Sequence, residues 1–280
     1  MTGTTDVSSA TRANIAIYDS LEAQSYVDEA PHLKHASLRQ RYRDLTSEVL
    51  ARLGIPVEEI AVLDLGAGEG SVTLDFLELG ARVTAVDSSD RQLAHLRQRA
   101  SAFGDRLTVR CGDAFDAVEA EKVAGSRFDL VICNSFLHHI PDYTRLVTDA
   151  VTLLTETGIF FSFQDPLRFS SLGTPVRIFT GVAYASWRLL KPDVLRGLGR
   201  RARRTVGIYR DDCPQDNAEY HVVRDGLNQD HLAQALRDAG TRVELKTYFS
   251  TQSPFWQRMG ERLGIANTFA IIAQRDPAFG

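Results

Sequence analysis

Three glycines alternate with other residues in a turn that directly follows a largely apolar run. The turn reads Gly66-Ala67-Gly68-Glu69-Gly70, and residues 60–65 before it are typical of a buried strand. Glycine lets a backbone adopt positive φ angles and approach a ligand closely. The helix that we expect after the turn presents unpaired N–H groups at its N-terminus. The pattern therefore predicts a binding loop for a nucleotide-like ligand.

Three carboxylates recur at the ends of successive strand-like runs. Asp64 lies two residues before the first glycine, Asp87 closes the next run, and Asp113 follows the third. The carboxyl ends of parallel strands meet at one edge of a sheet, where ligands bind. There the carboxylates can accept hydrogen bonds from an ammonium, from ribose hydroxyls and from an adenine amine. The series predicts a ligand with those three parts and no phosphate.

The turn departs from the patterns of two other nucleotide-binding loops. A P-loop requires lysine in GxxxxGK[ST], and residues 66–75 contain none. The NAD fingerprint GxGxxG places its third glycine one residue later than this chain does. Asp87 would nevertheless suit the ribose of NAD, so an NAD-dependent oxidoreductase stays open at this point.

Three residues are candidates for proton transfer. His138 and His139 follow a fourth strand-like run, and Asp165 ends a fifth. Histidine is the usual base near neutral pH. The alternatives are a turn histidine that hydrogen-bonds the backbone, and an aspartate before Pro166 that begins a turn.

The elements that position these residues alternate between strand and helix. This alternation predicts βαβ units and a parallel, doubly wound sheet. The expected strands are 60–65, 82–86, 107–111, 128–133, 158–163, 242–250 and 268–273, and the expected helices 71–79, 90–103, 143–155 and 229–239. Residues 254–264 are expected to be a linking segment.

Four segments, taken in order, resemble the motifs of class I S-adenosylmethionine-dependent methyltransferases. They are VLDLGAGEG, TAVDSSD, CGDAF and FDLVICNSFLHHIPD, within residues 55–165. The final strand pair resembles the antiparallel addition of that family. The resemblance implies an α/β, Rossmann-like sheet of seven strands, doubly wound, with an antiparallel last strand. It also implies S-adenosylmethionine as cofactor, S-adenosylhomocysteine as product and no metal.

The resemblance carries roles to particular residues. Gly66 and Gly68 would back the amino-acid part of the cofactor, Asp87 the ribose, and Asp113 with Ala114 the adenine. Asp87 as a helix N-cap and Asp113 as a turn residue are the alternatives. The full set of expected cofactor-binding residues is Asp64, Gly66, Ala67, Gly68, Asp87, Ser88, Gln92, Asp113, Ala114, Asn134, Tyr18 and Tyr26.

Four segments make up the expected domain plan. Residues 1–13 form a flexible tail, and residues 14–54 are an N-terminal helical lid divided at Pro31. The cofactor-binding core comprises 55–165 and 227–280, and an insertion at 166–226 caps the substrate. The insertion carries GRRARR at 199–204, which is either a solvated helical face or an anion-binding patch.

Composition narrows the function classes. A net charge of −4 disfavours nucleic acid as the main partner, and no apolar stretch is long enough to cross a membrane. Three cysteines without CxxC spacing favour a reduced, cytoplasmic protein. We expect a methyltransferase for a small molecule, typically a specialised metabolite. Alternatives are non-methylating chemistry such as cyclisation, and a non-catalytic binding subunit. The oligomeric state is open, a homodimer included.

Overall fold

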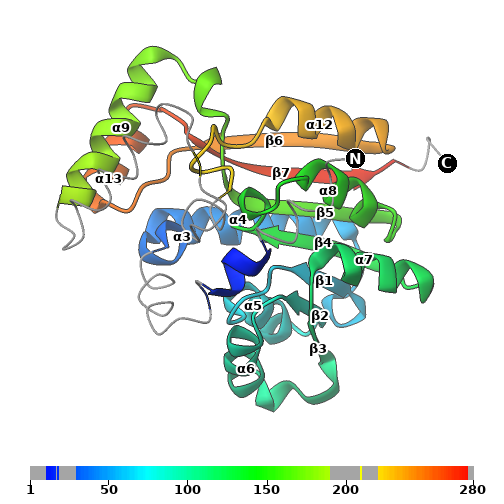
Figure 1. Ribbon diagram of the computed structural model, residues 1–280. Coiled ribbons are helices and arrows are strands. Elements are labelled where there is room, and N and C mark those ends of the chain that lie inside the picture. Colours follow the sequence, from blue (N-terminus) through cyan, green and yellow to red (C-terminus); the bar gives the residue numbers. More distant parts are fainter. Residues whose placement is uncertain (1–10, 17, 19–29, 190–208, 210–219, 277–280) are drawn as a thin grey trace.

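One mixed sheet of seven strands forms the centre of the computed structural model (Figure 1). The structure describes residues 11–16, 18, 30–189, 209 and 220–276. The strand order is β3-β2-β1-β4-β5-β7-β6. The strands are β1 (Ala61–Leu65), β2 (Arg82–Asp87), β3 (Leu107–Cys111), β4 (Phe128–Asn134), β5 (Leu154–Pro166), β6 (Thr241–Tyr248) and β7 (Thr268–Arg275).

Only the last of these strands runs against its neighbours. Strand β7 pairs antiparallel with both β5 and β6, whereas β1 to β5 pair in parallel. The predicted fold class, a doubly wound Rossmann-like sheet with an antiparallel last strand, is confirmed.

Helices cover both faces of the sheet (Figure 1). One face packs against α4, α5 and α6, and the other against α7, α8 and α12. Apolar residues on both sides bury the central strands, as parallel sheets require. These helices are α4 (Ala36–Leu53), α5 (Ser71–Leu79), α6 (Asp90–Arg99), α7 (Ala114–Val123), α8 (Tyr143–Val151) and α12 (Gln229–Asp238).

Two helices were not expected from the sequence. Helix α7 begins directly after Asp113, whose side chain caps it by accepting from the Phe115 N–H at 2.8 Å. Helix α13 (Pro254–Arg262) replaces the expected linking segment and has proline in its first turn. Both helices begin by ordinary rules, α7 after an aspartate N-cap and α13 with an N-terminal proline. Both are short; α7 has weak apolar periodicity, and α13 carries several charged residues.

The described N-terminal residues include 11–13, which the sequence assigned to a flexible tail of 1–13. Residues 11–16 are helical and Ala13 is buried. Pro31 begins α3 (Pro31–Lys34), and α4 ends at Leu53, directly before Gly54, whose φ is 66°. Proline at a helix start and glycine in the left-handed region at its end are the expected boundaries.

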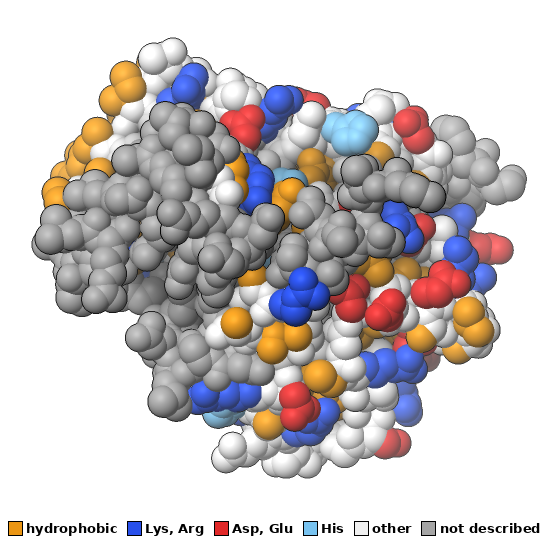
Figure 2. Space-filling model, in the orientation of Figure 1, with side chains coloured by type: hydrophobic (Ala, Val, Ile, Leu, Met, Phe, Trp, Pro, Cys, Tyr) orange, Lys and Arg blue, Asp and Glu red, His pale blue; other side chains and the backbone are white. Residues whose placement is uncertain are grey.

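The predicted cap contains one long described helix, α9 (Thr174–Leu189). Ile178, Val182 and Leu189 are exposed at helical spacing. Hydrophobic side chains accordingly gather over α9 in Figure 2. The GRRARR segment and Cys213 lie outside the described residues. Within the described part of the chain, no helix combines the length and apolarity needed to span a membrane.

Candidate functional site

The glycine turn packs tightly between β1 and the segment after β4. Gly66 has a φ of 79°, and a Cβ there would lie 2.2 Å from Phe136 Cδ2. The N–H groups of Gly66 and Ala67 both donate to the Val86 carbonyl, at 2.9 and 3.0 Å. Glycine is therefore required at position 66 by both conformation and space.

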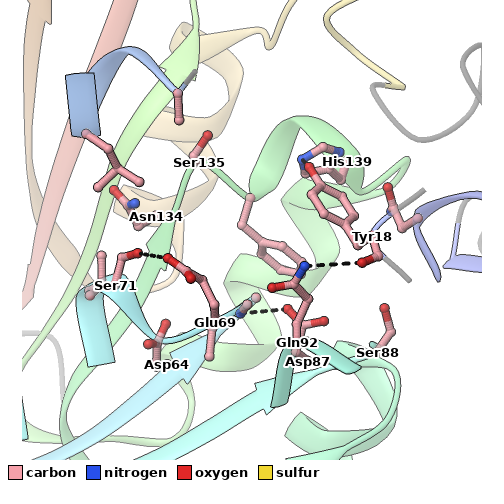
Figure 3. A pocket seen from close by; sticks show the side chains of 18 of the residues that line it. Tyr18, Asp64, Glu69, Ser71, Asp87, Ser88, Gln92, Asn134, Ser135 and His139 are labelled. Atoms are coloured by element: carbon pink, nitrogen blue, oxygen red, sulfur yellow. Dashed lines mark hydrogen bonds between the residues drawn. The ribbon is translucent and has the colours of Figure 1, made fainter. Parts of the chain in front are cut away.

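Asp87 fixes the turn from the end of β2. Its carboxylate accepts from the Gly68 N–H at 2.9 Å (Figure 3). It also accepts from the Ser89 N–H at 2.8 Å. Ser89, not Asp87, caps α6, because its hydroxyl accepts from the Gln92 N–H. The N-cap alternative for Asp87 is therefore wrong.

Asp64 is buried beneath the turn. Its carboxylate accepts from the Thr73 hydroxyl at 2.5 Å. Burial raises the pKa of Asp64 to about 7; the Thr73 hydrogen bond opposes this rise, and the negative charge of Asp87 adds to it. A buried carboxylate in this state can take up or release a proton near neutral pH, and a nearby cation would favour its charged form.

These residues line one pocket at the carboxyl edge of the sheet (Figure 3). Its empty volume is about 920 Å³, including the part open to solvent. The predicted residues that line it are Asp64, Gly66, Ala67, Gly68, Asp87, Ser88, Gln92, Asn134, Tyr18 and His139.

Four predicted residues do not line this pocket. Asp113 caps α7 and also accepts from the Thr11 hydroxyl at 2.8 Å, and Ala114 is the first residue of that helix. His138 and Asp165 lie outside the lining as well. A cofactor role for Asp113 and Ala114 stays a prediction. Tyr26 lies outside the described residues.

Three polar atoms of the pocket are shut off from solvent and have no hydrogen-bond partner within the described residues. They are Oδ1 of Asn14, Nδ1 of His32 and Oδ1 of Asn134. Buried polar groups in native proteins are nearly always paired. Such a cluster in one pocket indicates a polar ligand that supplies the missing partners.

The segment after β4 adds lining residues that the sequence interpretation did not assign. Ser135 has a φ of 52°, and its N–H donates to the Phe163 carbonyl at 2.7 Å. Positive φ in a residue other than glycine is uncommon and clusters at functional sites. The adjacent Phe136 forms the floor beneath Gly66. No local sequence signal marks Ser135.

His138 and Asp165 form a buried pair beside the pocket. Nδ1 of His138 donates to Asp165 Oδ1 at 2.8 Å, and the backbone N–H of His138 donates to the same oxygen at 3.2 Å. The Ser162 hydroxyl donates to Asp165 Oδ2 at 2.7 Å. In the neutral ring, donation to this carboxylate places the proton on Nδ1 and the lone pair on Nε2, as a general base requires.

A β-bulge in β5 creates this pair. Ser162 and Asp165 are three residues apart, so a regular strand would point them to opposite faces. The register against β7 shifts between Phe163 and Asp165, and the intervening Gln164 has a φ of 72°. The extra residue turns Asp165 to the face of Ser162. Bulges commonly re-aim side chains near functional sites.

His139 connects the buried pair to the pocket. Its ring centroid lies 4.1 Å from that of His138, and its Nε2 lies 3.3 Å from the Tyr18 hydroxyl. Tyr18 and His139 face each other across one side of the pocket in Figure 3. Gln92 Nε2 donates to the Tyr18 carbonyl at 3.2 Å. The N-terminal segment therefore closes on both α6 and the His138-His139 turn.

Among the described residues, no group of three or more His, Cys, Asp or Glu side chains is arranged to hold a metal ion.

Known proteins resemble this chain in part of its sequence and in its fold. The family described as "Methyltransferase domain" matches residues 62–158. Ubiquinone biosynthesis O-methyltransferase of Methylobacterium nodulans is 28% identical over 111 residues, which are 40% of this chain and 43% of that protein. The chain thus matches less than half the length of this curated relative.

Two solved structures show the same fold over nearly the whole chain. Magnesium protoporphyrin IX methyltransferase from Synechocystis PCC 6803, with bound S-adenosylhomocysteine, has a TM-score of 0.57 at 14% identity, covering 95% of this chain and 100% of that one. The cyclase SpnF has a TM-score of 0.57 at 16% identity, covering 96% and 97%. Residues 62–158 therefore match a methyltransferase domain family, and nearly the whole chain shares its fold with these two solved structures.

Proposed function

We propose that this protein transfers a methyl group from S-adenosylmethionine to a small-molecule acceptor. One observation carries the proposal: among the described residues the pocket lining includes Asp64, Glu69 and Asp87 and no lysine or arginine. This lining suits a cofactor that carries an ammonium and a sulfonium. It does not suit the pyrophosphate of NAD, which would meet several negative charges.

The residues present fit that cofactor in three respects. The glycine turn lets a ligand approach the backbone closely, and Asp87 lines the pocket from the end of β2. Buried polar atoms of the lining also lack hydrogen-bond partners within the described residues, and the cofactor would supply them. Asp87 would accept from ribose hydroxyls and Asp64 from the ammonium. When bound, S-adenosylmethionine supplies an electrophilic methyl group on sulfur.

The chain itself would supply alignment and proton removal. In this proposal His138 takes the proton of the acceptor on Nε2 while Asp165 holds its Nδ1–H. His139 and Tyr18 shape the pocket wall next to that base. We also propose a specialised metabolite as the acceptor and the cytoplasm as the setting, which the composition and cysteine pattern favour.

Ligand-induced stabilisation tests the cofactor. A ligand that binds the folded protein at 100 times its Kd adds about 2.7 kcal/mol to the free energy of unfolding. S-adenosylmethionine and S-adenosylhomocysteine are expected to raise the Tm, and NADH is not. A rise with NADH alone would favour the oxidoreductase alternative.

Mass spectrometry then tests the chemistry. The protein is incubated with S-adenosylmethionine and a panel of phenols, catechols and amines. We expect a product heavier by about 14 Da together with release of S-adenosylhomocysteine, as a methyl group replaces a proton. A product of unchanged mass, formed without that release, would support the cyclisation alternative, which the fold also accommodates.

Cofactor affinity is expected to rise between about pH 6 and pH 8. With a pKa of about 7, Asp64 is half protonated at neutral pH, and the ligand ammonium stabilises its charged form. Binding therefore releases a proton, which calorimetry in buffers of different ionisation enthalpy measures. Asp64→Asn is expected to abolish the release. Binding without proton exchange at pH 7 would contradict the role of Asp64.

The stability of the ligand-free protein is expected to change in the opposite direction. Between its ordinary pKa of 3.8 and the raised value of about 7, Asp64 is protonated in the folded state and ionised in the unfolded chain. The contribution of Asp64 to the free energy of unfolding therefore falls as pH rises through this window.

A further inference from the structure

Two of the unpartnered polar atoms belong to side chains, His32 and Asn134, that are hydrogen-bonded to each other through their other polar atoms. Nδ2 of Asn134 lies 3.2 Å from Nε2 of His32. The other polar atoms of these side chains, Nδ1 of His32 and Oδ1 of Asn134, are buried and have no partner in the described part of the chain. His32 comes from α3 and Asn134 from the end of β4, and both line the pocket.

The hydrogen bond between them fixes which atoms remain to bind a ligand. An amide nitrogen only donates, so Nε2 of His32 accepts and the ring proton lies on Nδ1. Burial, with a smaller effect from nearby His138, lowers the pKa of His32 to about 4, so the ring is neutral at physiological pH. The pair thus presents one donor, Nδ1–H, and one acceptor, Oδ1 of Asn134.

We propose that His32 and Asn134 form a recognition pair for the α-amino-acid head of the cofactor. Nδ1–H of His32 donates to the carboxylate, and Oδ1 of Asn134 accepts from the ammonium. This inference rests on the proposed function. It assigns to α3 a binding residue that the sequence interpretation, which favoured Tyr18 and Tyr26, did not include.

The surroundings favour an amino-acid head over other polar groups. Asp64 lines the same pocket from β1, which pairs with β4 next to Asn134, and supplies negative charge for the ammonium. Among the described lining residues no lysine or arginine is available for the carboxylate. A neutral N–H donor therefore takes that task. The ligand would also hold α3 against the sheet, because its carboxylate contacts His32 of α3 and its ammonium contacts Asn134 of β4.

A truncated ligand separates this role from a structural one. Methylthioadenosine shares the nucleoside and sulfur of S-adenosylhomocysteine but lacks the amino-acid head. Calorimetric titration of both ligands is carried out on the wild type, His32→Phe and His32→Asn. His32→Phe is expected to weaken S-adenosylhomocysteine by about 10- to 100-fold and methylthioadenosine by less than about twofold. His32→Asn keeps a donor near the position of Nδ1 and is expected to recover part of the loss.

His35 offers a matched control in the same segment. It lies between α3 and α4, outside the pocket lining, and its Nε2 contacts the Thr251 carbonyl at 2.7 Å. His35→Gln is expected to lower the Tm and to leave the ratio of the two affinities unchanged.

Each remaining outcome decides a different point. Equal weakening of both ligands by His32→Phe would assign His32 a structural role and overturn the inference. Unchanged binding of S-adenosylhomocysteine would overturn it too. A well-folded wild type that binds neither ligand would instead overturn the proposed function.

Discussion

Replacing His138 with alanine is expected to lower kcat by about 10²- to 10⁴-fold while leaving cofactor affinity nearly unchanged. The ring is held by Asp165 through Nδ1, so its Nε2 lone pair is available to accept a proton. Because His138 does not line the cofactor pocket, its loss removes a base and not a cofactor contact. Single-turnover rates with saturating cofactor, beside calorimetric Kd values, measure the two effects separately.

Asp165→Asn extends this test to the supporting carboxylate. The amide keeps the shape of the side chain but no longer favours the Nδ1–H tautomer, so we expect a loss of about 10²-fold or more in kcat. His95→Ala, at an exposed position on α6, is the matched control and should have no effect. Full activity of His138→Ala would show that the acceptor needs no base from this pair. A loss in His139→Ala alone would move the base to the pocket-lining histidine.

Asp87→Ala is expected to weaken S-adenosylmethionine binding by about 100-fold or more. In the proposed complex its two carboxylate oxygens accept from ribose hydroxyls, and hydrogen bonds to a charged group contribute about 1.5–3 kcal/mol each. The same carboxylate holds the turn through the Gly68 N–H. The substitution therefore removes ligand contacts and loosens the loop that carries them. Isothermal titration calorimetry measures the loss.

Asp90→Ala is the control for the aspartate at position 87. Asp90 lies three residues further along, in the first turn of α6, with its side chain 75% exposed and paired with Arg97 at 3.3 Å. Its loss is expected to leave the affinity unchanged. Unchanged affinity in Asp87→Ala, with the protein folded by circular dichroism, would remove Asp87 from the binding site.

The sequence predicts best what depends on neighbouring residues. Helix α5 begins and ends where expected because Gly70 and Gly80 flank it. Strand β3 also has the expected bounds. Asp64 and Asp87 reach one pocket because each lies at the carboxyl end of a parallel strand. Their placement follows from the fold class alone.

Contacts between distant segments could not be predicted in the same way. His32 and Asn134 are 102 residues apart, and neither carries a local signal for the other. Asp113 is ambiguous from sequence, because an aspartate before a helix caps it whether or not it also binds a ligand. The bulge at Gln164 breaks the alternation on which strand interpretation depends, and glutamine gives no sign of its positive φ.

That bulge also bears on how related sequences are to be compared. The partnership of Asp165 with His138 depends on the number of residues in β5 as much as on their identity, since one extra residue decides which side of the sheet Asp165 faces. Removing Gln164 would keep every chemical group of the pair yet shift the strand by one position, and a one-residue shift sends side chains to the opposite face. An aspartate at the equivalent position of another protein with this fold therefore predicts the same pair only if the chain before it has the same length.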